Sequence, residues 1–163
     1  SYDKESKSKF ALLCLDIDSF KPINDNFGHQ RGDAVLKDLY NIFRSHVAPN
    51  DIVARYGGDE FLIVQHNAGP DEAFDLSQTL VRAVEEYDSG LVHPRVGNLT
   101  IGVSIGYSCF PIDGNDCAGL LAAADTHMYR TKSDRKLTRM VPAAATKPLP
   151  PITDEIITGV LTP

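Results

Sequence analysis

The chain has 163 residues, of which 42% are hydrophobic and 23% charged, and its formal net charge is −6 at pH 7. This length and composition are typical of one globular domain with a hydrophobic core of its own. The acidic balance argues against binding to a nucleic-acid backbone, which favours a basic surface, but it leaves a nucleotide ligand open.

The cysteines and the ends of the chain indicate the compartment. Cys14, Cys109 and Cys117 are odd in number, and their spacing matches neither a zinc site nor a disulfide framework. We interpret them as free thiols in a reducing compartment. No apolar run is long enough to span a bilayer, and no signal peptide is visible. The chain starts with the polar stretch SYDKESKSKF, which is typical of a cut inside a longer chain. We therefore expect a cytoplasmic domain of a larger protein, such as a sensor, without membrane contact of its own.

The first half of the chain predicts a strand, a helix and a hairpin. Residues 10–18 are apolar and then acidic, as in a buried strand whose carboxyl end carries carboxylates. The next segment holds proline, asparagine and glycine and predicts a turn or a short broken helix. Residues 33–47 have apolar residues at helical spacing. Residues 51–65 form two short apolar runs around Gly57-Gly58, which predicts a tight hairpin with a primed turn.

The second half predicts a helix, a strand and a helix. Residues 70–90 are amphipathic, residues 99–110 alternate and are rich in β-forming residues, and residues 116–133 again have helical spacing. This order of elements predicts an α+β fold with helices packed on one sheet. The expected inward-facing residues of the two helices are Phe74, Leu80, Val81, Val84, Leu120, Leu121, Ala124 and Met128.

The composition divides the chain into three parts. Residues 1–9 are a truncated lead-in, and residues 10–140 form the one predicted domain. Residues 141–163 are rich in proline and alanine and predict a linker or an extended tail without a core of its own.

Carboxylates gather where apolar runs end. Asp16 and Asp18 close the first predicted strand and face the same side of it, because they are two residues apart. Asp59 and Glu60 follow the glycine pair directly and face opposite sides if the strand is regular. If the hairpin lies beside the first strand, Asp16 and one hairpin acid converge. Two or three carboxylates without a nearby histidine or cysteine make a hard oxygen site that suits Mg²⁺ or Mn²⁺.

The alternative is that each acid is a solvated turn residue, and for any single acid the two interpretations weigh about evenly. The set as a whole favours the metal site, because apolar runs lead directly into it. The glycine pair adds a turn without side chains, which lets a phosphate approach the backbone closely. The arrangement therefore predicts a metal-held phosphate at a surface edge, as in nucleotidyl chemistry.

Four motifs resemble one known family. Residues 55–61 read RYGGDEF and resemble the signature of the GGDEF family of diguanylate cyclases letter for letter. Upstream, DIDSFKPINDNFGHQRGD resembles the family's second long motif, and downstream SIGYSCFP and AADTHMYRTK resemble its later blocks. The resemblance covers about residues 10–136. It implies a palm-like fold, ferredoxin-like or nucleotide-cyclase-like, with a mostly antiparallel central sheet flanked by helices.

The resemblance also implies an activity. In this family two domains each hold one GTP, the two meet head to tail, and cyclic di-GMP and two pyrophosphates form. That implies bacterial second-messenger signalling, Mg²⁺ or Mn²⁺ as the cofactor, a transient homodimer and no nucleic-acid partner. The alternative is a catalytically silent GTP-binding regulatory or sensor module, but such members often lack a signature acid and none is missing here. A purely structural dimerisation domain would have little need for the whole set of polar residues.

Named positions carry the family's roles by the same resemblance. It implies Asp16, the carbonyl of Ile17, Asp59 and Glu60 as metal ligands. The implied catalytic residues are Glu60, nearest the chemistry, Asp59 and the phosphate-binding Lys132. The implied GTP-binding residues are Phe20, Lys21, Asn24, Asp33, Gly57, Gly58 and Lys136.

The guanine-reading assignment of Asn24 and Asp33 agrees with hydrogen-bond chemistry. A carboxylate can accept from guanine N1–H and N2–H together, and adenine lacks this pair of donors. A mismatched base would leave the buried polar group unpaired, which is costly.

Several positions depart from the family pattern. Asp51 stands at the aspartate position of the family's arginine-x-x-aspartate inhibitory site, but Ala48 replaces the arginine. Because arginine makes the bidentate contacts to phosphate or guanine, we expect weak or absent product inhibition there. After Lys132 the family usually has glycine and arginine, where this chain has Arg135 and Lys136. Two lone histidines are also interpreted as non-ligands: His127 as packing or surface, and His29 as structural.

Overall fold

The computed structural model describes residues 8–95 and 97–140, and only the backbone over 136–140. The predicted lead-in up to residue 7 and the predicted tail over residues 141–163 lie outside the described residues, as does the side chain of Lys136. No helix of the described part is long and apolar enough to cross a membrane.

Four strands form one antiparallel sheet in the order β2-β3-β1-β6. Its strands are β1 (Phe10–Asp18), β2 (Ile52–Arg55), β3 (Glu60–His66) and β6 (Gly102–Phe110). The helices are α1 (Phe20–Phe27), α2 (His29–Ser45), α3 (Pro70–Glu85) and α4 (Cys117–Met140). A separate two-stranded sheet joins β4 (Val92–His93) to β5 (Gly97–Asn98).

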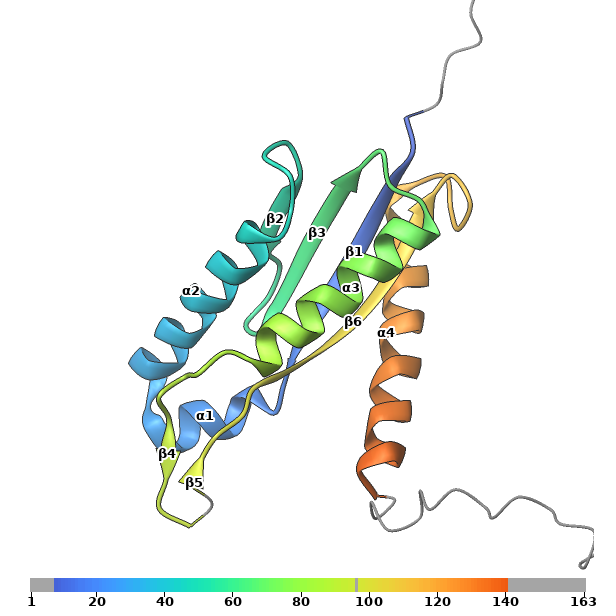
Figure 1. The fold of residues 1–163 in the computed structure, drawn as a ribbon. Coiled ribbons are helices and arrows are strands. Elements are labelled where there is room, and N and C mark those ends of the chain that lie inside the picture. The colour runs from blue at the N-terminus through green and yellow to red at the C-terminus, as the bar shows by residue number, and fades with distance from the viewer. Residues whose placement is uncertain (1–7, 96, 141–163) are drawn as a thin grey trace, which may run out of the picture.

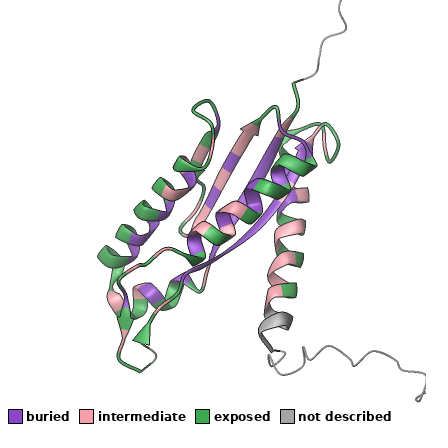
Figure 2. Cartoon of the chain, in the orientation of Figure 1, coloured by how far each residue is buried: buried purple, intermediate pink, exposed green. Residues whose placement is uncertain are grey.

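The helices flank the sheet, as predicted for an α+β fold (Figure 1). The side chains of Leu13, Leu15 and Ile17 on β1 belong to the core beneath α1, α2 and α3. The intervening residues of β1 face the opposite side, where α4 covers β6 and β1. The central strand is therefore buried on both faces, and Figure 2 shows it as a largely purple ribbon. Because β1 is central, its acidic carboxyl end lies between the hairpin and β6.

Most predicted elements are confirmed, with differences at their ends. The segment after β1 forms the short helix α1, and α2 begins at His29 rather than at residue 33. Helix α4 continues to Met140, beyond the predicted end at residue 133. The small β4–β5 sheet was not predicted, because strands of two residues are too short to show a period.

One inward-facing prediction is wrong. Phe74 on α3 is 51% exposed, whereas Ala73, Leu76, Leu80 and Val84 are buried. These residues repeat at helical spacing, so the buried stripe of α3 passes beside Phe74 rather than through it.

Helix α4 lies very close to β6 because the facing residues of the strand are small. A Cβ atom added to Gly106 would lie 2.1 Å from the backbone nitrogen of Met128 and 2.2 Å from the carbonyl oxygen of Ala124. Next to it, the Ser108 hydroxyl donates to the carbonyl of Leu120 at 2.7 Å. The close approach brings the later turns of α4 to the acidic end of β1.

Candidate active site

Two predicted metal ligands meet across the sheet. In the register of β1 and β3, Asp16 lies directly opposite Glu60. The prediction that Asp16 converges with one hairpin acid is therefore confirmed. The neighbouring Ile17 N–H donates to the Asp59 carbonyl at 3.0 Å, so the strand end and the hairpin loop are bonded to each other. Asp59 itself lines a pocket with residues of α1 and α2, and Glu60 lines a cavity beneath α4, so the two acids do face different sides.

The hairpin loop is held by Arg55. Its guanidinium donates to the carbonyl of Gly57 at 3.1 Å and to that of Gly58 at 2.7 and 3.1 Å. Neither glycine has a positive φ, so the prediction of a primed turn is wrong. The loop instead closes through bonds from the Tyr56 and Gly57 N–H groups to the Glu60 carbonyl. A Cβ atom at Gly57 would lie 2.8 Å from Glu60 Oε2, so a side chain at residue 57 would displace the Glu60 carboxylate.

The carboxylates at this end of the sheet repel one another and attract the ammonium group of Lys132. Burial, followed by the negative charges of Asp16, Asp59 and Asp125, raises the pKa of Glu60, and Lys132 acts in the opposite direction. Lys132 Nζ donates to Asp16 Oδ2 at 2.9 Å, and this hydrogen bond is the main reason why the pKa of Lys132 is raised. The predicted phosphate-binding lysine is therefore paired with a predicted metal ligand.

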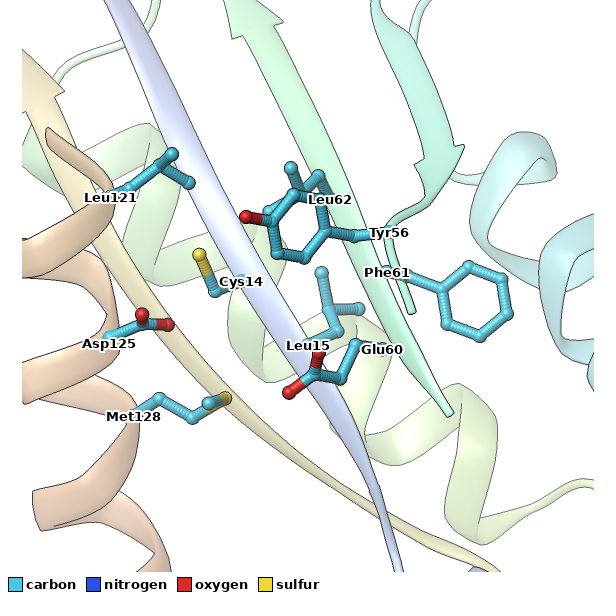
Figure 3. A pocket seen from close by; sticks show the side chains of 9 residues that line it. All are labelled: Cys14, Leu15, Tyr56, Glu60, Phe61, Leu62, Leu121, Asp125 and Met128. Atoms are coloured by element: carbon cyan, nitrogen blue, oxygen red, sulfur yellow. The ribbon is translucent and has the colours of Figure 1, made fainter. Parts of the chain in front are cut away.

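The carboxylates of Asp16, Asp59 and Glu60 together form what we call the acidic corner. A cavity of about 210 Å³ lies beside it, between the sheet and α4. Figure 3 shows the carboxylates of Glu60 and Asp125 facing it, with Cys14 at its floor. Burial and the Asp125 carboxylate raise the pKa of the Cys14 thiol to about 12, so it stays protonated and unreactive at neutral pH. Cys14, Cys109 and Cys117 are all free thiols, as predicted. Asp125 was not predicted as a site residue, although it lies in the AADTHMYRTK block.

A second cavity, of about 370 Å³, is lined by predicted GTP-binding residues of α1, α2 and the hairpin loop, but not by the predicted Gly57. This volume lies in the range of small-molecule sites. His29 and Arg55 also line it, although His29 was interpreted as structural and Arg55 was not singled out. The signal for Arg55 is a cation two residues before the first glycine of the pair. The predicted residues that line this cavity are Phe20, Lys21, Asn24, Asp33, Gly58 and Asp59.

Gly32 keeps the position of Asn24 in this cavity. A Cβ atom at Gly32 would lie 1.9 Å from Asn24 Oδ1 and 3.1 Å from the ring of Phe20. The absence of a side chain at residue 32 is therefore what allows the Asn24 carboxamide to lie against α2.

The acidic corner has the donors that a hard divalent cation prefers. Within the part of the chain that the structure describes, no three His, Cys, Asp or Glu side chains form a group that could hold a metal by themselves. Mg²⁺ is commonly held by one or two carboxylates together with substrate phosphates, so a complete protein cage is not required. Asp16 and Glu60, which lie opposite each other, fit that mode of binding. Ile17 and Asp59 are their neighbours in the chain, but the Asp59 side chain lines the other cavity. Burial and then the neighbouring negative charges raise the pKa of Glu60, and a bound cation would offset those charges.

The carboxylate of Asp51 is buried and hydrogen-bonded to backbone groups. Its side chain is 6% exposed, and its oxygens accept from the Ala48 N–H at 2.9 Å and from the His66 N–H at 2.8 Å. Arg44 donates to the carbonyls of Ala48 and Asp51. The aspartate of the degenerate inhibitory motif thus caps the turn before β2.

We expect Asp51→Ala to lower the free energy of unfolding by roughly 1–3 kcal/mol, because two backbone N–H groups lose their acceptor. Urea denaturation measures this loss, and Asp75→Ala on the exposed side of α3 is the control. The response of the protein to added cyclic di-GMP should not change. Tight product inhibition that disappears in Asp51→Ala would contradict this assignment.

His127 packs against the sheet, as interpreted from the sequence. Its Nδ1 accepts from the Tyr107 N–H at 3.0 Å, and the two rings meet edge to face at 4.4 Å. Because β6 is an edge strand of the four-stranded sheet, this contact satisfies a backbone group that no neighbouring strand reaches.

Comparison with known proteins identifies the family. Residues 1–137 match the family model described as "Diguanylate cyclase, GGDEF domain", so the chain belongs to the GGDEF family. It is 35% identical over 130 residues to diguanylate cyclase A of Treponema denticola, which is 80% of this chain and 34% of that protein. It is also 35% identical over 124 residues to the bifunctional diguanylate cyclase/cyclic di-GMP phosphodiesterase MucR of Pseudomonas aeruginosa, covering 76% of this chain and 18% of that protein. The chain thus spans about a third or less of these two relatives.

Solved structures show the same palm-like α+β fold. The GGDEF domain of YfiN from Pseudomonas aeruginosa matches with a TM-score of 0.70 and 30% identity, covering 80% of each chain. The active GGEEF domain of a diguanylate cyclase from Vibrio cholerae matches with a TM-score of 0.68 and 31% identity, covering 77% of this chain and 78% of that chain. The predicted fold class is therefore confirmed.

Proposed function

We propose that this domain is a diguanylate cyclase that condenses two GTP molecules into cyclic di-GMP and two pyrophosphates. The observation that carries the proposal is the pairing of Asp16 with Glu60 at the strand end, next to the cavity that holds Asn24 and Asp33. The names of the relatives support it, because proteins that resemble the chain over most of its length are called diguanylate cyclases. The cytoplasmic location belongs to the same proposal, since GTP is a cytoplasmic substrate.

In this proposal one group of residues binds the guanine base and another binds the phosphates. Asn24 and Asp33 bind the Watson–Crick edge of guanine, and Phe20 and Lys21 at the start of α1 face the phosphates. Asp16, the Ile17 carbonyl, Asp59 and Glu60 would hold Mg²⁺ or Mn²⁺, and a bound ion offsets the charge of the triphosphate. Because each GTP supplies its 3′-oxygen to the α-phosphate of the other, two domains must meet as a transient homodimer.

Glu60 and Lys132 act nearest the reacting groups in this proposal. Glu60 promotes loss of the proton from the attacking 3′-hydroxyl, and a new bond from that oxygen to phosphorus replaces the bond to pyrophosphate. Lys132, which is paired with Asp16, would supply a positive charge that stabilises the leaving pyrophosphate. Its present ion pair with Asp16 keeps the ammonium group within the site.

The test is GTP turnover with Mg²⁺, followed by chromatography, over a dilution series of the protein. Cyclic di-GMP formed at a rate that rises more steeply than the protein concentration supports both the reaction and the transient dimer. GTP binding without product at any concentration would favour the silent GTP-binding module. That alternative stays open because one relative, at 36% identity over 76% of this chain, is named a cyclic di-GMP phosphodiesterase.

The nucleotide cavity provides a separate prediction. We expect Gly32→Ala to weaken binding of a fluorescent GTP analogue roughly tenfold, because the new Cβ displaces the Asn24 carboxamide and leaves a base contact unmade. Alanine is favoured over glycine in a helix by about 1 kcal/mol, whereas the close contacts with Asn24 and Phe20 oppose this gain. Thermal unfolding of the variant therefore separates lost stability from lost affinity. Gln30→Ala, exposed on the same helix, is the control for affinity. Unchanged affinity in Gly32→Ala would contradict the role of Asn24.

A further inference from the structure

Arg135 connects α4 to three other elements near the acidic corner. Its Nη1 donates to Asp18 Oδ2 at 3.3 Å and to the carbonyl of Val103, and its Nη2 donates to Glu85 Oε1 at 2.9 Å. The side chains of Arg135 and Asp18 are only 24% and 16% exposed. One guanidinium thereby joins α4 to the end of β1, to β6 and to the last turn of α3.

Two ion pairs connect α4 to the acidic end of β1. Lys132 and Arg135 are three residues apart and therefore lie on the same side of the helix. Asp16 and Asp18 are two residues apart and face the same side of the strand. Lys132 binds Asp16, and Arg135 binds Asp18. Between the two acids lies Ile17, whose carbonyl is one of the proposed metal ligands.

The carboxylate of Asp18 is held from two directions at the point where the chain leaves the sheet. Its Oδ1 accepts from the Ser104 hydroxyl at 2.6 Å, while its Oδ2 faces Arg135. The next residue, Ser19, has a φ of 54°, a left-handed conformation that costs a non-glycine residue free energy. This turn leads directly into α1 with Phe20, so Asp18 anchors the junction between the metal-binding strand end and the phosphate-facing helix.

We propose that Arg135 is a positioning residue for the metal and the triphosphate, and that it acts through Asp18. This inference rests on the proposed function, because it concerns the same site. By fixing Asp18, Arg135 holds the Ile17 carbonyl and the Asp16 carboxylate in place on one side and the start of α1 on the other. Arginine suits this role because its planar group donates in several directions at once, which lysine cannot reproduce.

A purely electrostatic role of Arg135 and a positioning role predict opposite effects of its removal on cation binding, so an experiment can distinguish them. If Arg135 acted only as a nearby positive charge, its removal would strengthen the binding of a cation at Asp16. If it positions the strand end, its removal weakens cation binding, and lysine does not restore it. Loss of partners in the outer shell of a metal site commonly weakens metal binding about 10–100-fold.

The experiment measures Mn²⁺ binding by electron paramagnetic resonance in the presence of a non-hydrolysable GTP analogue, whose phosphates complete the proposed site. The values of kcat and KM for GTP are measured separately on the same proteins. We expect Arg135→Ala and Arg135→Lys each to weaken Mn²⁺ binding roughly tenfold and to lower kcat/KM for GTP. Glu85→Gln, which removes only the negative charge of the outer partner of Arg135, should retain Mn²⁺ binding. Arg130→Ala, exposed on the same helix, is the matched control. Thermal unfolding of each variant identifies any effect that comes from lost stability, and Arg135→Lys serves as the second variant should Arg135→Ala not fold.

The outcomes distinguish failure of the positioning role of Arg135 from failure of the cyclase proposal. Wild-type-like Mn²⁺ binding in Arg135→Lys with tighter binding in Arg135→Ala would overturn the positioning role and leave the cyclase proposal intact. Failure of the unchanged chain to bind Mn²⁺ in the presence of a non-hydrolysable GTP analogue would contradict the proposed function and, with it, this inference. Weaker binding in both variants, with Arg130→Ala unchanged, supports Arg135 as a positioning residue.

Discussion

The Glu60→Gln variant is expected to form cyclic di-GMP at least about a hundredfold more slowly, because it loses the carboxylate that we propose to hold the metal and to promote loss of the hydroxyl proton. The glutamine keeps the size of the side chain, so the hairpin and the nucleotide cavity should remain and GTP should still bind. Chromatography of the products measures the rate, and titration with a fluorescent GTP analogue measures binding.

The same variant should not be less stable at neutral pH. Burial and the neighbouring carboxylates raise the pKa of Glu60, so its charged form is disfavoured in the fold relative to the unfolded chain. Removing that charge should leave the metal-free protein as stable as before or more stable above the pKa of Glu60. The difference should disappear as the pH falls and Glu60 becomes protonated.

Thermal unfolding over a pH series without metal tests this expectation, with Glu86→Gln at the exposed end of α3 as the control. Lower stability of Glu60→Gln at neutral pH would contradict the electrostatic account of the acidic corner. Full cyclase activity in the same variant would contradict the catalytic role of Glu60.

Gly106→Ala is expected to lower the free energy of unfolding by about 3 kcal/mol or more, the upper end for overpacking. The new Cβ would lie within 2.6 Å of three backbone atoms of α4, which cannot rotate away as a side chain can. Moving the helix would break the contacts of Ser108 with Leu120 and of His127 with Tyr107. It would also draw Lys132 away from Asp16, so cyclase activity should fall as well.

Urea denaturation measures the effect of Gly106→Ala, and Gly58→Ala is the matched control for stability. A Cβ at Gly58 would meet nothing within 4 Å, and Gly58 has no positive φ. The control should therefore unfold like the unchanged protein. A Gly106→Ala protein as stable as that control would show that α4 can move away from β6 at little cost.

By itself the sequence determined the local elements and the chemistry available to them. The apolar run that ends at Asp18, the helical spacing around Leu39 and the alternation before Phe110 predicted the right kinds of element, because burial on one or two faces leaves a period in the chain. The four motifs identified the family, which the comparisons confirm. They also supplied the acids and the residues proposed to face guanine, which the fold brings to one end of the sheet.

Only the tertiary structure decided how these residues meet. The pairing of Asp16 with Glu60 depends on strand register, and the bonds from Arg135 to Asp18 depend on how closely α4 approaches the sheet. The hairpin loop also differs from the predicted primed turn, and the side chain of Arg55 holds it through the Gly57 and Gly58 carbonyls. Such contacts join residues that are far apart in the chain or depend on exact geometry, and neither leaves a periodic pattern in the sequence.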